Sequence, residues 1–115
     1  MEPVHLVAGN GEACGRLEDT RSGKRLFLEA GEEMVSAHFS GFIYRDAEAA
    51  GALLVSAVEY ARVMDCPAVF CAVPSGRMDQ LRPFLGNLQV TEAPASIYGI
   101  GLDGEADWWM DTAEI

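Results

Sequence analysis

The chain has 115 residues, half of them apolar, and its 18 acidic and 8 basic residues give a formal net charge of −10. This length fits one domain with its own core, so we expect residues 1–115 to form a single domain. A strongly negative chain repels nucleic acid phosphates and anionic membrane surfaces, and we expect neither as a partner. No apolar run approaches a bilayer span, no signal peptide is recognisable, and the number of cysteines is odd. Together these features predict a cytoplasmic protein with reduced thiols.

The first third of the chain predicts an antiparallel meander of short strands. Residues 3–8 form the first candidate strand, and the Asn10-Gly11 pair that follows supplies the positive φ angles of a tight hairpin. Residues 12–19 and 24–30 continue the meander, each bounded by turn-forming residues. We expect these strands to pair with the longest strand, which comes next.

The longest predicted strand covers residues 34–44. A glycine in its middle, Gly41, predicts a bulge or a close approach of another backbone. Strict alternation places His38 on the more polar face, where we expect a partly exposed side chain rather than a metal ligand. The apolar face of this strand is expected to comprise Val35, Ala37, Phe39, Gly41 and Ile43.

A helix is predicted directly after this strand. Asp46 can cap it, because a carboxylate there accepts hydrogen bonds from N–H groups of the first turn. Residues 68–73 form a continuous apolar run after Pro67, as expected for a strand that is covered on both faces and runs parallel to residues 34–44. The apolar stripe of the helix is expected to comprise Ala50, Leu54, Ala57, Val58, Ala61 and Met64.

The last third predicts a second helix over residues 77–85 and further strands. These strands are expected at residues 88–93, 96–102 and 108–110. The order is then β-β-β-β-α-β-α-β-β, an α+β fold with two helices and a mixed, largely antiparallel sheet of about six or seven strands. A ligand-binding regulatory domain of STAS or ferredoxin-like type is an alternative, because both interleave helices and strands, but neither opens with such a meander.

The turn between the long strand and its helix reads RDAEAA (residues 45–50). Together with the order of elements over residues 24–110, this turn resembles the GNAT superfamily of acyl-CoA-dependent N-acetyltransferases. In that family the turn carries R/Q-x-x-G-x-G/A, and its backbone N–H groups hold the pyrophosphate of coenzyme A at the helix N-terminus. Arg45 matches the first position and Ala50 the last, whereas Glu48 replaces the central glycine.

The resemblance implies acetyl-CoA or another acyl-CoA as cofactor, and no metal. By the family's pattern, backbone amides of Phe42 and Tyr44 would hold the pantetheine arm and Arg45 would face the phosphates. Ala50 and Gly51 would complete the cofactor-binding turn. All five residues lie at or directly after the end of the long strand, so one turn would carry the whole cofactor site.

Three departures from the family's pattern predict that activity is reduced or lost. The carboxylates of Asp46 and Glu48 in the first helical turn repel the phosphate that this turn would bind. Phe84 stands near the place of the family's tyrosine, which protonates the leaving thiolate. Phenylalanine has no proton to give. Tyr98, on a later predicted strand, is either a cross-strand neighbour of the tryptophans or the catalytic hydroxyl that is absent at Phe84. The family's N-terminal substrate helices have no counterpart here.

The sequence therefore leaves two functions open. The first is an acyl-CoA-dependent N-acyltransferase of reduced or lost activity. The second is a non-catalytic module with a GNAT-like fold that binds a protein partner or forms a homo-oligomer, because a sheet edge without cover invites pairing. In the second case Trp108 and Trp109 are the expected interface, since neighbouring strand residues point to opposite faces and one tryptophan can be exposed.

Overall fold

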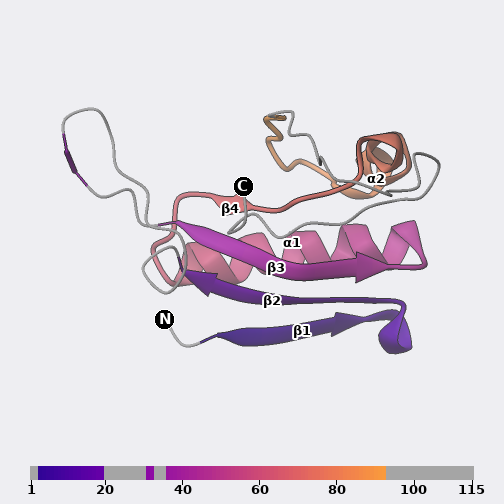
Figure 1. Cartoon of the computed structure of the whole chain (residues 1–115), viewed down its shortest axis with the longest axis horizontal. Coiled ribbons are helices and arrows are strands. Elements are labelled where there is room, and N and C mark those ends of the chain that lie inside the picture. Colours follow the sequence, from indigo (N-terminus) through magenta and orange to yellow (C-terminus); the bar gives the residue numbers. More distant parts are fainter. Residues whose placement is uncertain (1–2, 20–30, 33–35, 93–115) are drawn as a thin grey trace, which may run out of the picture.

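The computed structural model describes residues 3–19, 31–32 and 36–92. In chain order it contains the strands β1 (Val4–Ala8), β2 (Ala13–Asp19) and β3 (Ala37–Tyr44), the helix α1 (Ala47–Val63), the short strand β4 (Val69–Phe70) and the short helix α2 (Met78–Leu81) (Figure 1). Single 3-10 turns lie at Gly9–Gly11, Ser75–Arg77 and Arg82–Phe84. The candidate residues Tyr98, Trp108 and Trp109 lie outside the described residues, as do the predicted strands at residues 24–30, 96–102 and 108–110.

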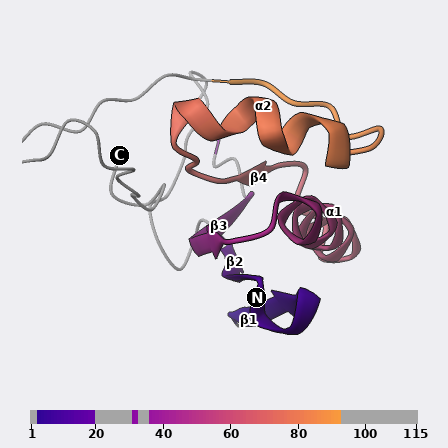
Figure 2. The same cartoon turned by 90° about the vertical axis from the view of Figure 1, so that its right-hand side faces the viewer.

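The described strands form one sheet in the order β1-β2-β3-β4. β1 and β2 pair antiparallel, β2 and β3 pair antiparallel, and β3 and β4 pair parallel, with α1 as the connection between the parallel pair. Figure 2 shows α1 on one side of the strands, where it packs across β1, β2 and β3. The described part is therefore α+β with a mixed sheet, as predicted. The six or seven strands and the GNAT-like order of elements are not confirmed.

The predicted first hairpin is confirmed. Asn10 lies in the left-handed region with a φ of 56°, between Gly9 at 60° and Gly11 at 91°. Glycine and asparagine adopt positive φ with little strain, so this local sequence suits the connection. The hairpin sets the register of the two strands, in which Val7 faces Cys14.

The predicted bulge at Gly41 is also confirmed, and it shifts the phase of β3. One residue of β2, Gly15, faces both Gly41 and Phe42, since the register shifts between Cys14 and Arg16. Gly41 has a φ of 61°, which a residue without a Cβ adopts freely. The bulge adds one residue to β3 and reverses the alternation of its side chains beyond that point.

The residues of β3 that belong to the apolar core follow the reversed alternation. Ala37 and Phe39 are buried before the bulge, whereas Phe42 and Tyr44 are buried after it. Ile43 is 54% exposed, so its predicted place on the apolar face is wrong. The ring centroids of Phe39 and Phe42 lie 5.4 Å apart, and those of Phe42 and Tyr44 lie 5.5 Å apart. These rings belong to the core cluster that joins the sheet to α1.

His38 is buried, although the sequence predicts partial exposure. The residue is 2% exposed, and its ring centroid lies 5.9 Å from that of Phe70 on β4. Alternation alone missed this burial, because it depends on the elements that cover the face. β4 itself is two residues long and half-buried, which is shorter and less covered than the strand predicted for residues 68–73.

The helix α1 starts at the predicted cap and buries a slightly different stripe. The carboxylate of Asp46 accepts a hydrogen bond from the N–H of Ala49 at 3.1 Å. Leu54 and Val58 are half-buried and Met64 is exposed, so the predicted stripe is displaced at these three positions. The helix residues that are buried are Ala49, Ala50, Gly51, Leu53, Ala57 and Ala61. No helix in the described part of the chain is long and apolar enough to span a bilayer.

The predicted second helix over residues 77–85 is divided into one α-helical segment between two 3-10 turns. Pro83 accounts for the end of the α-helical segment, because proline lacks the N–H that would continue the helical hydrogen bonds. Leu81 and Leu85 of this region are buried. Residues 88–92, expected to begin a strand, have no regular secondary structure.

Two glycines allow close packing against backbone or ring atoms. A Cβ added to Gly51 of α1 would lie 2.3 Å from the Cβ of Phe84 and 2.6 Å from its carbonyl oxygen. A Cβ added to Gly15 of β2 would lie 2.4 Å from the ring of Phe39. No side chain fits at these distances. Glycine at both positions is therefore required for the segment after α2 to pack on α1 and for the Phe39 ring to lie over β2.

Candidate functional site

The candidate site lies at the carboxyl end of β3. The parallel ladder between β3 and β4 ends at the pair of His38 and Phe70, whereas β3 continues to Tyr44. Beyond the ladder a surface pocket of about 510 Å³ opens between the end of β3, the start of α1 and the turn that leads into α2. It is lined by Tyr44, Arg45, Ala47, Gly76, Arg77 and Gln80. Small-molecule sites typically measure about 300–1,000 Å³.

The backbone at the end of β3 directs one edge toward β2 and the other toward the pocket. The N–H of Arg45 donates to the carbonyl of Glu12, 2.8 Å away, at the start of β2. Successive strand residues direct their N–H and C=O groups to opposite edges, so those of Tyr44 and Phe42 face the side of β4. The carbonyl of Tyr44 accepts a hydrogen bond from Arg77, which agrees with this direction.

Arg77 connects the turn before α2 to the end of β3. Its Nη1 donates to the carbonyl oxygen of Tyr44 over 3.5 Å, and its Cζ lies 5.3 Å from the centre of the Tyr44 ring. A guanidinium over an aromatic ring is attracted by the negative face of the ring. Because Tyr44 is buried in the core, it holds the guanidinium of Arg77 at the wall of the pocket.

The N-terminus of α1 borders the pocket through Ala47. The first turn of a helix carries a partial positive charge that favours anions. Here the carboxylate of Asp46 already accepts the N–H of Ala49, so one amide that would face a phosphate is engaged by the protein itself. Glu48 is the second acidic residue of this turn. Both acidic residues predicted to oppose a phosphate therefore stand at the helix end that borders the pocket.

The structure places the predicted cofactor-binding residues in two groups. Tyr44 and Arg45 line the pocket. Phe42 is buried in the core two residues earlier, with its backbone directed to the same edge as that of Tyr44. Ala50 and Gly51 are buried within α1, and neither lines the pocket.

Sequence analysis did not assign Arg77 or Gln80 to the site. Both follow β4, which runs parallel to β3. The carboxyl ends of parallel strands meet at one edge of a sheet, and ligands bind in the space beyond them. The position of Arg77 and Gln80 after the second parallel strand is therefore the signal that could have indicated them.

Metal and disulfide chemistry have no support in the described residues. Within residues 3–19, 31–32 and 36–92, no group of three or more His, Cys, Asp or Glu side chains could hold a metal ion. Cys14, Cys66 and Cys71 form no disulfide.

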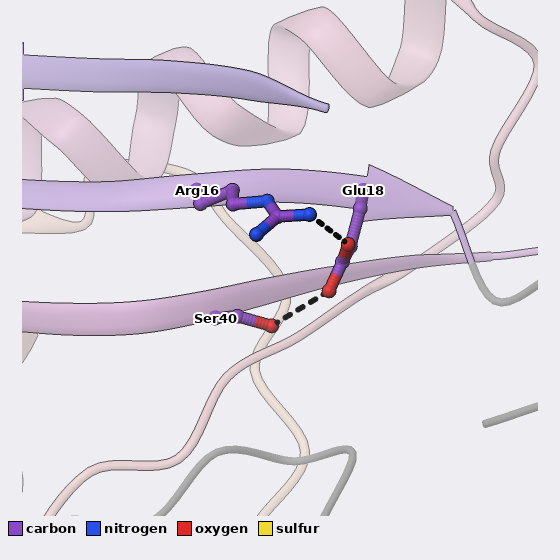
Figure 3. Close-up of polar contacts among 3 residues, drawn as sticks. All are labelled: Arg16, Glu18 and Ser40. Carbon is purple, nitrogen blue, oxygen red and sulfur yellow. Dashed lines mark hydrogen bonds and ion pairs between the residues drawn. The ribbon is translucent and has the colours of Figure 1, made fainter. Parts of the chain in front are cut away.

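The sheet face opposite α1 carries a separate polar cluster. Nη2 of Arg16 lies 3.1 Å from Oε2 of Glu18, and Oγ of Ser40 donates to Oε1 of Glu18 over 3.2 Å (Figure 3). Each carboxylate oxygen thus has a donor from β2 or β3. The side chain of Arg16 is 47% exposed, so water and salt weaken this ion pair. The cluster is explained by contacts between the strands and requires no ligand.

Comparisons of the chain with protein-family models, with curated proteins and with solved structures found no match in any of the three. No family is shown by similarity. The function is therefore argued from the pocket and its residues.

Proposed function

We propose that the protein binds an acyl-CoA in the pocket at the end of β3 and is a GNAT-like N-acyltransferase of reduced or lost activity. The position of the pocket is the observation that supports this most. It opens at the end of β3, beyond the residues that pair with β4, it borders the N-terminus of α1, and two arginines line it. The GNAT resemblance of residues 24–110 assigns the pyrophosphate and the pantetheine arm to this part of the fold.

The residues at the pocket suit a diphosphate that carries an extended arm. Arg45 and Arg77 supply two guanidinium groups, which bind phosphate oxygens in a bidentate manner. By the GNAT resemblance, the backbone amides of Phe42 and Tyr44 would hold the pantetheine arm in the manner of an added strand. A bound acyl-CoA would supply an activated thioester for transfer to an amine.

The same region supports weak or absent turnover. Phe84, near the place of the family's tyrosine, has no hydroxyl and packs against Gly51 of α1. Tyr98 remains the candidate proton donor for the leaving thiolate. Asp46 and Glu48 oppose the phosphates at the start of α1. We therefore propose ligand binding with slow transfer or none.

Thermal denaturation with acetyl-CoA tests this proposal. A ligand that binds only the folded state adds about 2.7 kcal/mol of stability at 100 times its Kd. For a domain of this size, that corresponds to a rise in Tm of roughly 10 °C. Pantetheine and ATP, tested alone, separate the contributions of the arm and of the phosphates. An unchanged Tm at millimolar acetyl-CoA would contradict acyl-CoA binding.

Glu48→Gly tests the acidic turn. The change removes a carboxylate beside the phosphate site, and we expect the affinity for coenzyme A to rise about two- to fivefold. Titration calorimetry measures this change. Glu59→Gly is the matched control, because it removes the same charge and introduces the same glycine near the other end of α1. Equal effects of the two substitutions would show that Glu48 does not oppose the ligand.

A second candidate function is a non-catalytic module that self-associates, and β1 supports it. β1 is the terminal strand of the described sheet, and its sequence VHLVA contains no Lys, Glu or Pro that would hinder pairing. Val7 is 65% exposed and lies in line with Cys14 and the exposed Ile43 across the sheet. A second copy paired to β1 would extend this apolar row.

Light scattering of Val7→Lys tests self-association. If β1 forms the contact, the wild-type protein is a dimer and the variant is a monomer, because a lysine on an edge strand opposes pairing. Val63→Lys is the control, since Val63 is 79% exposed at the end of α1. Trp108→Ser and Trp109→Ser test the predicted tryptophan interface in the same assay. A wild-type monomer at every concentration would contradict this function.

A further inference from the structure

We propose that Asn10 is a site of spontaneous deamidation and that the turn between β1 and β2 controls its rate. In this reaction the backbone nitrogen of Gly11 attacks Cγ of the Asn10 side chain and a C–N bond forms. The side-chain amide nitrogen leaves as ammonia, which takes up the proton of the Gly11 N–H. Water then opens the succinimide ring at one of its two carbonyls to give aspartate or isoaspartate. The proposal requires neither an acyl-CoA nor a second copy of the chain.

The residue that follows Asn10 favours this attack. It is Gly11, which has no side chain to hinder its backbone nitrogen. Both residues are exposed, and a Cβ added to Gly11 would have no atom within 4 Å, so water reaches the turn from this side. The other asparagine of the chain, Asn87, is also exposed but precedes Leu88, whose branched side chain hinders its nitrogen. Asn10 is therefore the asparagine of this chain that combines exposure with an unhindered nucleophile.

The present turn keeps the two reacting atoms apart. It is closed by the N–H of Glu12, which donates to the carbonyl of Gly9 over 3.1 Å. Its central residues have a φ of 56° at Asn10 and 91° at Gly11, as in a type I′ turn. The ψ of Asn10 is 37°. At this ψ the nitrogen of Gly11 lies nearly opposite to the Cβ of Asn10 about the Cα–C bond, so the succinimide ring cannot close.

Rotation of the peptide plane between Asn10 and Gly11 brings these atoms together. The rotation converts a type I′ turn into type II′, in which ψ of the first central residue is about −120°. The nitrogen of the next residue then lies on the same side of the Cα–C bond as Cβ, which is the arrangement that ring closure needs. Type II′ requires glycine at the first central position, whereas Asn10 has a Cβ. We expect this strain to slow the reaction in the folded protein about tenfold or more relative to the unfolded chain.

The turn lies next to the start of α1 and the end of β3. A Cβ added to Gly9 would lie 2.9 Å from the Cβ of Ala49 in α1. The carbonyl of Glu12 accepts the N–H of Arg45, 2.8 Å away, and Arg45 lines the pocket. Isoaspartate has one more main-chain atom than asparagine, which changes the spacing of these contacts. Deamidation at Asn10 is therefore expected to weaken the hydrogen bond that holds the backbone of Arg45 at the edge of the pocket.

Incubation of the 115-residue chain at neutral pH, in buffer and in guanidinium chloride, tests the proposal. Peptide mass mapping locates the modified residue, and ion-exchange chromatography separates the products, which carry one more negative charge than the unmodified chain. We expect modification at Asn10 and not at Asn87. We expect the rate in denaturant to be at least about tenfold higher than that in buffer. Asn10→Gly is the control, because glycine suits both turn types and has no side-chain amide.

Hydrogen exchange of the Arg45 amide tests the effect of the modification on the fold. It should be faster in the purified isoaspartate form than in the unmodified protein. In Asn10→Asp it should stay close to the wild-type rate, because the main chain is unchanged. The proposal is overturned if Asn10 stays unmodified in buffer and in denaturant, if denaturant does not raise its rate, or if Asn87 reacts as fast. Equal exchange of the Arg45 amide in all forms would overturn the link between the turn and the edge of the pocket.

Discussion

Replacing Gly51 with alanine tests how the segment after α2 packs on α1. The new Cβ would lie 2.3 Å from the Cβ of Phe84, 2.6 Å from its carbonyl oxygen and 2.9 Å from its carbonyl carbon. Two of these three atoms belong to the backbone, so rotation of a side chain cannot relieve the contact. The segment that contains Phe84 must therefore move away from α1.

The sign of the change in the free energy of unfolding distinguishes a packing effect from an effect of helix propensity. In a helix interior, Gly→Ala alone gains about 1 kcal/mol. Overpacking of a core contact costs about 1–3 kcal/mol, and here backbone atoms must move. We expect Gly51→Ala to lower the free energy of unfolding by about 1–2 kcal/mol, measured as a lower urea midpoint at an unchanged m value.

The neighbouring exposed position of α1 provides a matched control. Ala52→Gly makes the reverse change at a residue that α1 exposes, so it should cost about 1 kcal/mol through propensity alone. Phe84→Ala in the Gly51→Ala background should restore no stability, because alanine keeps the Cβ as well as the carbonyl group of residue 84. A gain of about 1 kcal/mol for Gly51→Ala would refute the reasoning, because it would show propensity without a clash.

Three further predictions concern the sheet and the start of α1. Gly15→Ala should cost about 1–3 kcal/mol in urea denaturation, because its Cβ would lie 2.4 Å from the ring of Phe39; an unchanged midpoint would mean that the ring is not held there. Asp46→Ala should cost about 1 kcal/mol of stability by removing the cap of α1, whereas Asp46→Asn should be nearly neutral. Phe42→Ala should cost about 3–5 kcal/mol, and Ile43→Ala much less, because the bulge directs the first inward and the second outward. Similar costs at these two positions would contradict the reversed alternation.

Local sequence signals predicted the features that depend on a few neighbouring residues. The Asn10-Gly11 hairpin, the bulge at Gly41 and the cap at Asp46 all occur as expected, because each follows from the backbone or side-chain chemistry of one or two residues. The prediction that Ile43 lies on the apolar face of β3 is wrong. The glycine indicated a bulge, but the prediction continued the alternation through it without the extra residue.

Features that depend on distant segments were beyond the sequence pattern. The burial of His38 depends on what lies over its face, including Phe70 of β4. Arg77 joins the site because the ends of two parallel strands converge at one edge, and no motif in its own neighbourhood indicates this. Ala50 and Gly51, assigned to the cofactor-binding turn from a motif, are buried in α1 and do not line the pocket.

Because of the bulge at Gly41, the fold of β3 should tolerate deletion of this residue better than its substitution. The inward residues of β3 have odd numbers before the bulge and even numbers after it, because Gly41 is one extra residue. Deletion of Gly41 would therefore give a regular strand in which Phe39, Phe42 and Tyr44 are still directed inward. Any residue with a Cβ at this position would instead have to adopt a φ of 61°, at a cost of about 1 kcal/mol or more. Because a bulge bends and twists its strand, a chain shortened by this residue would run straighter beside β4.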